Sequence, residues 1–203
     1  MLSKLYRVAV VTAAAACFAI TSLTSLSVSA KGVFQSGPDF YAEVFAPQQG
    51  ESKVLWLTPE IRTQAAVIVD HPVRGLRIRY HQNTNKTAWI LEEIGKEMPI
   101  TIGVVVEDDV IQQVKILAYR ESRGGEVRYP AYTAQYKGAA LQEDYRLNQN
   151  IDGITGATLS MWAVNKAAAL ALYYHAVVTE SSSTKSSLIK SSLTKSSATN
   201  SPK

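Results

Sequence analysis

The segment NIDGITGATLSMWAVNKAAALALYYHAVV, residues 150–178, changes character at Thr158. Before that point the residues are mostly small or hydroxyl-bearing and include Gly153 and Gly156. From Thr158 to Val178 the side chains are almost all apolar, and the clearly polar exceptions are Ser160, Asn165, Lys166 and His175. The pattern predicts a glycine-containing loop followed by a long helix that is buried on most sides.

The start of such a helix is suited to binding an anion. The first backbone N–H groups of a helix have no intrahelical partner and carry a partial positive charge. Gly153 and Gly156 permit tight turns and the close approach of a ligand. A simpler interpretation is that Thr155 or Thr158 caps the helix with its hydroxyl group. The segment contains neither a Gly-Lys-Ser/Thr phosphate-binding loop nor a G-x-G-x-x-G sequence after a strand.

The order of residues from Asp152 to Thr158 resembles the flavinylation motif D-x-x-(S/T)-G-A-(T/S) of the FMN-binding domain family. That family includes FMN-carrying subunits of the sodium-pumping NADH:quinone oxidoreductase and FMN domains of periplasmic reductases. The resemblance implies that a flavin transferase esterifies the phosphate of FMN to the hydroxyl of Thr158. The cofactor-binding residues predicted from this segment are Thr158, Asp152, Gly153, Thr155, Gly156, Ala157, Leu159 and Ser160.

A second segment agrees with this resemblance. Glu121-Ser122-Arg123-Gly124-Gly125 is similar to the Glu-Thr-Pro-Gly-like loop that family members often carry near the flavin, with Arg123 in place of proline. The resemblance therefore adds Glu121 and Ser122 to the predicted site and covers about residues 101–178. The three histidines are scattered along the chain, so we predict no catalytic residues and no metal site.

The rest of the chain predicts an α+β fold, an antiparallel β meander packed with helices. Thr58 followed by Pro59 is a normal helix start, so residues 59–69 are expected to form a helix. Four strands are then expected in succession, at residues 74–82, 87–94, 99–106 and 110–119. Residues 91–97, LEEIGKE, are also compatible with a helix. We interpret the three tryptophans, Trp56, Trp89 and Trp162, as core residues rather than flavin-stacking residues.

The first 30 residues are typical of a secretory signal peptide. Lys4 and Arg7 precede an apolar run that ends in Val28-Ser29-Ala30, a small-x-small cleavage pattern. Two other interpretations remain: a retained membrane anchor, and a lipoprotein modified at Cys17, the only cysteine of the chain. Cleavage after Ala30 leaves a mature chain without cysteine, which excludes disulfides and thiolate metal sites.

The last 23 residues, 181–203, are rich in serine and lysine and are predicted to be disordered. The domain proper is therefore placed at residues 31–180. Two basic residues lie in the first segment and four in the last, which leaves 15 basic and 17 acidic residues in the domain. The domain has no excess of positive charge, so nucleic acid is not an expected partner.

These observations predict an exported flavoprotein with covalent FMN that transfers electrons between redox partners. It would lie in the periplasm or at the outer face of the inner membrane. Its expected partners are a flavin transferase and membrane or periplasmic redox proteins such as cytochromes or quinone-linked reductases. We favour an electron-transfer protein or redox subunit over a stand-alone enzyme. The alternatives are a noncovalent binding or sensory module on the same fold, and a flavin reductase with its own small-molecule acceptor.

Overall fold

A computed structural model of the protein describes the backbone of residues 32–197 and the side chains of residues 32–181. The predicted signal peptide at residues 1–30 and the last six residues of the predicted tail lie outside the described residues. None of the helices in the described part of the chain is both long and apolar enough to cross a membrane.

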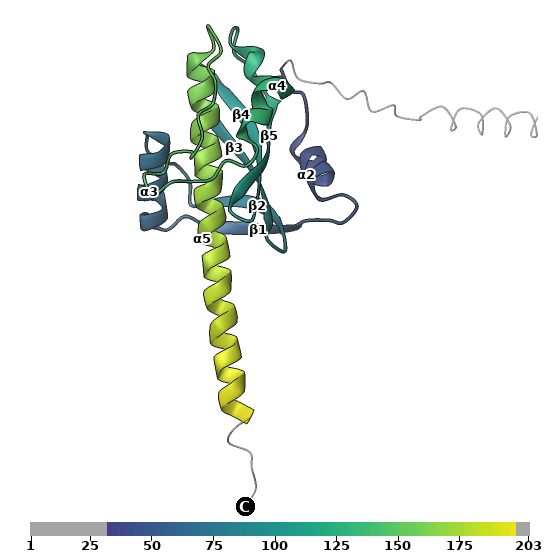
Figure 1. The fold of residues 1–203 in the computed structure, drawn as a ribbon, viewed down its shortest axis with the longest axis vertical. Coiled ribbons are helices and arrows are strands. Elements are labelled where there is room, and N and C mark those ends of the chain that lie inside the picture. Colours follow the sequence, from purple (N-terminus) through teal and green to yellow (C-terminus); the bar gives the residue numbers. More distant parts are fainter. Residues whose placement is uncertain (1–31, 198–203) are drawn as a thin grey trace, which may run out of the picture. The chain divides into compact units, whose positions relative to one another are not determined.

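The centre of the fold is a five-stranded antiparallel sheet in which strand order follows chain order (Figure 1). The strands are β1 (Glu51–Trp56), β2 (Arg77–Asn83), β3 (Lys86–Ile94), β4 (Pro99–Glu107) and β5 (Val110–Ala118). The predicted meander and the α+β class are confirmed, and residues 91–94 belong to a strand rather than a helix. The sheet has one strand more than predicted, because β1 buries a single side chain, Leu55, and shows no alternating pattern.

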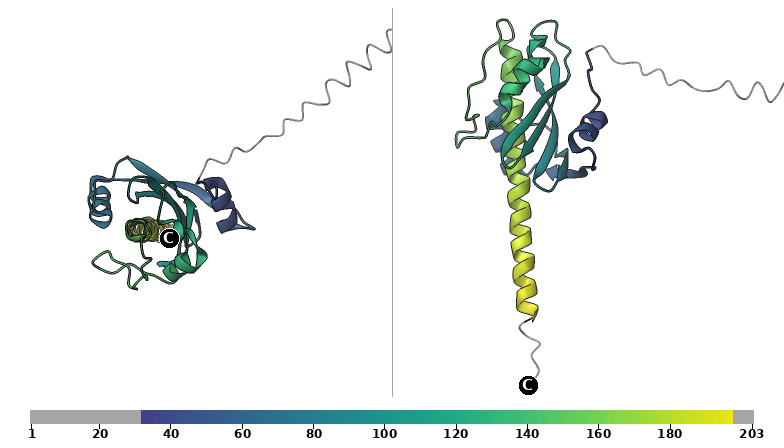
Figure 2. Two further views of the ribbon diagram at one scale, coloured as in Figure 1. Left: turned by 90° about the horizontal axis from the view of Figure 1, so that it is seen from above. Right: turned by 45° about the vertical axis from the view of Figure 1, so that its right-hand side comes forward.

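Helices cover both faces of this sheet (Figure 2). One face packs against α2 (Gly37–Phe45), which the sequence analysis did not predict, through a small cluster around Phe40. A β-carbon on Gly103 of β4 would lie 2.6 Å from the Phe40 ring, so glycine is needed for this close packing. The other face carries the main core and packs against α5 (Thr158–Ser197).

The helix α3 (Pro59–Val69) has the bounds that the sequence predicted. The backbone N–H of Ile61 donates a hydrogen bond of 3.4 Å to Oγ1 of Thr58, which is therefore the N-cap. Contacts join α3 to α5, so α3 covers part of the main core beside the longer helix.

The last helix, α5, begins at Thr158 as predicted but ends later than expected. We expected it to end near Val178, whereas the structure continues the helix to Ser197 and thus through most of the segment predicted to lack structure. From Leu159 to Ser201 the sequence contains neither glycine nor proline. Each further residue therefore adds a helical hydrogen bond at little cost once the helix has formed.

Between β5 and α5 the chain forms only short helical elements. These are the 3₁₀ segments η1 (Gly125–Arg128) and η2 (Ala134–Tyr136) and the single turn α4 (Pro130–Thr133). Residues 137–157 then lead to the start of α5. They contain no further helix, and their only strand-like contacts are isolated β-bridges.

Candidate flavin-binding site

A tight turn precedes α5 in the segment that resembles the flavinylation motif. The backbone N–H of Ala157 donates a hydrogen bond of 3.0 Å to the carbonyl oxygen of Ile154. Gly156 stands at the third position of this turn with a φ of 84°, a value that favours glycine. No atom outside the adjacent residues lies within 4 Å of the position of a β-carbon on Gly156, so space is open beside this residue.

The helix starts directly after the turn. The first helical hydrogen bond runs over 2.9 Å from the N–H of Met161 to the carbonyl oxygen of Ala157. The N–H groups of Thr158, Leu159 and Ser160 therefore precede the first intrahelical bond and have no carbonyl partner within the helix. Such groups are hydrogen-bond donors for an anion at this end of α5.

Thr155 and Thr158 are both exposed. In the part of the chain that the structure describes, neither hydroxyl group makes a hydrogen bond. The simpler interpretation, in which one of them caps α5 through its side chain, is therefore not what the structure contains. The hydroxyl of Thr158 stands free at the first residue of the helix and is accessible to a reacting partner.

The second segment of the resemblance packs against this junction. Gly124 has a φ of 80° and lies so close to α5 that a β-carbon on it would be 2.8 Å from Oγ of Ser160 and 3.3 Å from Cα of Ala157. Only glycine permits this approach without displacing its neighbours. The fold thus brings residues 121–125 and residues 152–158 together, as the resemblance implies.

Tyr119 holds the two segments in place. Its hydroxyl group donates to the carbonyl oxygen of Arg123 and lies 2.8 Å from Oγ of Ser160. Ser160 is consequently buried and directed inward, away from the exposed face that carries Thr158. Burial raises the pKa of Tyr119, although the hydrogen bond with Ser160 acts in the opposite direction. The sequence analysis did not identify Tyr119, because 41 residues separate it from Ser160.

Glu121 has a structural role on the other side of its loop. Its Oε1 accepts hydrogen bonds from the backbone N–H groups of Lys96, Glu97 and Met98, at 2.6, 2.6 and 2.9 Å. Burial acts to raise the pKa of Glu121, but these three hydrogen bonds outweigh it and lower the pKa. Glu121 therefore fixes the β3–β4 turn, while the neighbouring Ser122 is exposed.

The remaining predicted residues lie around the turn. Asp152 and Gly153 are exposed, and the backbone N–H of Asp152 donates to Oε1 of Gln135 over 2.8 Å. Ala157 is buried beneath the turn, whereas Leu159 is exposed on the first turn of α5. The carboxylate of Asp152 accepts no hydrogen bond among the described residues and is available to a partner protein.

The prediction that all three tryptophans are core residues holds only for Trp89, which is fully buried. Trp162 is 56% exposed and Trp56 is 62% exposed. Trp162 follows Thr158 by four residues and therefore lies on the same face of α5, one turn further on. An exposed ring at this place supplies a flat apolar surface next to the free hydroxyl group.

A pocket of about 720 Å³ adjoins the second segment. It is lined by Glu121 and Ser122 and also by aromatic and basic side chains, but not by residues 152–158. The guanidinium of Arg128 lies 5.1 Å from the ring centre of Phe34 and 5.3 Å from that of Tyr129. The pocket therefore offers aromatic surface and positive charge next to Tyr119.

One comparison with known proteins gives a match, to a family model. Residues 95–173 match the family model described as FMN-binding domain. The matched range contains β4, β5 and the two segments that meet at Gly124. Neither the search of curated proteins nor the search of solved structures gave a match.

The residues present are suited to FMN. A phosphate needs N–H donors and, for a covalent bond, a free hydroxyl group, and the first turn of α5 has both. An isoalloxazine ring needs flat apolar surface, which the exposed Trp162 on α5 and the rings of Phe34 and Tyr129 in the adjoining pocket supply. The match to the FMN-binding domain model and the chemistry of these groups together indicate a flavin-binding protein.

Proposed function

We propose that this protein carries FMN covalently, through a phosphoester to Oγ1 of Thr158, and transfers electrons between redox partners outside the cytoplasm. The observation that carries the proposal is the free, exposed hydroxyl of Thr158 at the first residue of α5. It is the last residue of the flavinylation-like segment and lies within the part of the chain that matches the FMN-binding domain.

Thr158 has a defined role in the attachment. Its oxygen would form the bond to phosphorus and lose its proton, while the pyrophosphate bond of FAD, the substrate of the transferase, would break and AMP would leave. The N–H groups of the first turn of α5 would donate hydrogen bonds to the phosphate oxygens. The open space beside Gly156 admits the phosphate next to the backbone.

Once bound, FMN supplies a group that accepts and donates one or two electrons. The protein holds this group, sets its surroundings and leaves part of it accessible. Arg128, which lines the adjoining pocket, supplies positive charge that would offset negative charge on a reduced ring. An ester bond also prevents loss of the cofactor by dilution after export.

Maturation requires a flavin transferase that recognises the exposed turn. Asp152, exposed and without a hydrogen bond to its carboxylate, is suited to contact that enzyme. The residues that would receive electrons from the flavin belong to membrane or periplasmic redox proteins, such as cytochromes or quinone-linked reductases. We place the protein in the periplasm or at the outer face of the inner membrane on the basis of residues 1–30.

The test is to produce the full chain with an active flavin transferase and to unfold the purified protein in denaturant. Flavin absorbance that stays with the unfolded chain after gel filtration supports covalent attachment. Reduction of the folded protein, followed by its rapid reoxidation by a soluble cytochrome, supports electron transfer. A colourless chain, made with a transferase that modifies a second substrate in the same cells, would leave only the noncovalent binding module.

A further inference from the structure

A second pocket, of about 710 Å³, lies where two strands of the sheet separate. The strand β2 pairs with β3 only from Tyr80 opposite Trp89 to Asn83 opposite Lys86. Beyond Tyr80, residues 77–79 continue to pair with β1, and residues 90–94 pair only with β4. The gap between the diverging strands is closed from below by α5 and bounded by the connection from α3 to β2.

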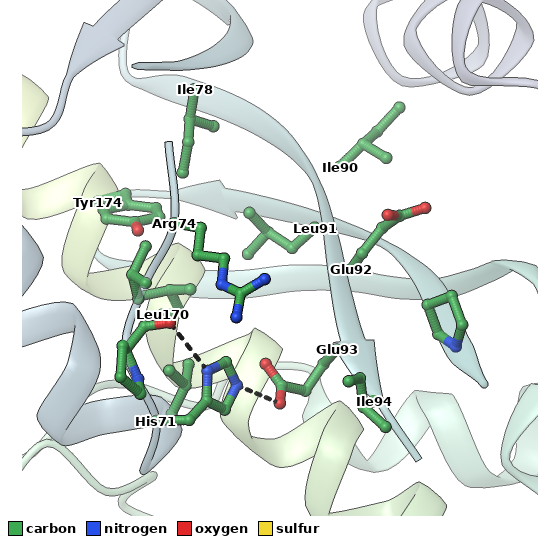
Figure 3. A pocket seen from close by; sticks show the side chains of 14 residues that line it. His71, Arg74, Ile78, Ile90, Leu91, Glu92, Glu93, Ile94, Leu170 and Tyr174 are labelled. Atoms are coloured by element: carbon green, nitrogen blue, oxygen red, sulfur yellow. Dashed lines mark hydrogen bonds and ion pairs between the residues drawn. The ribbon is translucent and has the colours of Figure 1, made fainter. Parts of the chain in front are cut away.

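Most of the lining is apolar. Leu91 and Ile94 come from β3, Ile78 from β2, Leu170 from α5 and Val73 from the connection (Figure 3). A pocket of this size with a mainly aliphatic lining is typical of sites for small organic molecules. Leu170 is 12 residues from Thr158, about 18 Å along the helix, so this pocket is separate from the proposed flavin site.

A buried donor without a partner faces this lining. Tyr174 of α5 is fully buried, and its hydroxyl oxygen makes no hydrogen bond among the described residues. Burial raises the pKa of Tyr174 above its usual value, so the hydroxyl stays protonated and can donate. A buried polar group without a partner is costly, and an acceptor placed in the pocket would remove that cost.

The charges of the pocket leave one cation free. Nε2 of His71 lies 2.8 Å from Oε1 of Glu93, whose side chain is only 6% exposed, so these two groups are partners of each other. Glu92 also lines the pocket, and its Oε1 accepts a hydrogen bond of 3.2 Å from the hydroxyl of Thr101. Arg74 has no ion pair or hydrogen bond within the described part of the chain, and Figure 3 shows it reaching across the middle of the pocket.

From these contacts we infer that the pocket binds an amphipathic carboxylate, a small molecule with an aliphatic body and one anionic end. The aliphatic body lies against Leu91, Ile78 and Leu170. The carboxylate is held by the guanidinium of Arg74, which suits the geometry of a carboxylate, and accepts a hydrogen bond from the hydroxyl of Tyr174. The His71–Glu93 pair lines the pocket beside Ile94, and its ion pair stays in place when the carboxylate binds.

Isothermal titration calorimetry of the full chain with octanoate tests this assignment, with 1-octanol as the neutral probe of equal length. We expect octanoate to bind and 1-octanol to bind about tenfold more weakly or worse, since a hydrogen-bonded charge is lost. Octanoate that produces no heat at millimolar concentration, or 1-octanol that binds as tightly, would overturn the proposal.

Four variants locate the binding. Arg74→Gln and Tyr174→Phe should each weaken octanoate binding, Arg74→Gln by about tenfold. Val73→Trp, which fills the pocket from the connection, should abolish it. Arg79→Gln is the matched control, because Arg79 is an exposed arginine of β2 that lines a different pocket. Equal affinity in Arg74→Gln and the unaltered protein would contradict the assignment, as would binding that survives in a folded Val73→Trp protein.

The experiment is independent of flavin attachment. Thr158→Val should bind octanoate with the same affinity as the unaltered chain, because the two sites are separate along α5. A protein that fails to bind octanoate would therefore not contradict the proposed flavin site. A protein that fails to carry flavin would not contradict the proposed carboxylate pocket.

Discussion

Two threonines, one in contact with α5 and one at its first residue, differ in burial and in hydrogen bonding. Thr87 of β3 is fully buried, and its Oγ1 lies 2.8 Å from Nε1 of Trp89 and 2.7 Å from Nδ1 of His175. Thr158 at the start of the same helix is exposed and has no partner among the described residues. A threonine side chain is therefore a fixed part of the core at position 87 and an exposed, free hydroxyl group at position 158.

The neighbours of the Thr87 hydroxyl determine the direction of both its hydrogen bonds. The indole N–H of Trp89 can only donate, so Oγ1 of Thr87 accepts from it and its own proton is free for Nδ1 of His175. The proton of the imidazole then lies on Nε2, which faces Oδ1 of Asp109 at 3.5 Å. We conclude that changes at Thr87 affect stability, whereas changes at Thr158 affect chemistry.

The largest expected effect is at the free hydroxyl. Thr158→Val should abolish covalent flavin while changing the free energy of unfolding by no more than about 0.5 kcal/mol, because the side chain is exposed. Thr158→Ser should retain some flavin, since it keeps the hydroxyl group. Thr155→Ala is the control, and should load normally when absorbance of the denatured protein is measured. Loss of flavin in Thr155→Ala but not in Thr158→Val would move the attachment site.

The opposite pattern is expected for the buried threonine. Thr87→Val keeps the shape but leaves the N–H of Trp89 and Nδ1 of His175 without a partner, which should cost about 1–3 kcal/mol of unfolding free energy. Flavin per folded molecule should stay unchanged. Thr101→Val, on the neighbouring strand with a hydrogen bond to the exposed Glu92, is the matched control for urea titrations. A Thr87→Val protein as stable as that control would disprove the role given to the buried network.

A third comparison uses two glycines with the same backbone. Gly124 and Gly138 have φ values of 80° and 81°, but only Gly124 would bring a β-carbon within 4 Å of other atoms. Both alanine variants should lose about 1–2 kcal/mol through backbone strain. Gly124→Ala should lose more and should also load less flavin, because Ser160 and Ala157 must move. Equal stability and equal loading of the two variants would show that the contact of Gly124 with α5 does not position the site.

The smallest effect is expected from pH. Burial lowers the pKa of His175, although Asp109 and Asp108 act against it. In the unfolded chain histidine titrates at about pH 6.5, so the unfolded chain binds the proton first and stability is lost as the pH falls below that value. The melting temperature should decrease from pH 7.5 to pH 5.5, and His175→Gln should show a smaller decrease.

The matched variant for the pH prediction is His81→Gln. Burial also lowers the pKa of His81, but this ring is only half-buried and stacks on Tyr41 with 3.8 Å between ring centres. Removing it should reduce the pH dependence less than removing His175. A melting temperature that depends equally on pH in the unaltered protein and in His175→Gln would contradict the assignment.

Much of the fold follows from local sequence signals. Thr58-Pro59 fixes the start of α3, and the change of character at Thr158 fixes the start of α5. The α2 helix has similar signals at its start, since Oγ of Ser36 accepts a hydrogen bond of 3.2 Å from the N–H of Asp39 and Pro38 lies in the first turn. The strand β1 had no usable signal, because an edge strand that buries one side chain has no hydrophobic period.

The candidate site could be predicted only for the two segments that resemble the FMN-binding domain family. The two segments of the resemblance do meet, but their contact depends on Tyr119 and on the absence of a side chain at Gly124. Such contacts between distant parts of a chain leave no local pattern in one sequence. For the same reason the inward direction of Ser160 and the use of Glu121 by the β3–β4 turn could not be predicted.

The central claim is that Thr158, and no other hydroxyl group, carries the flavin. The direct measurement is peptide mass spectrometry of the full chain produced with an active flavin transferase. The account predicts the added mass of FMN on the peptide that spans residues 152–160, with fragment ions that place it on Thr158. The same mass on Thr155 or Ser160, or no added mass although the transferase modifies another substrate in the same cells, would contradict it.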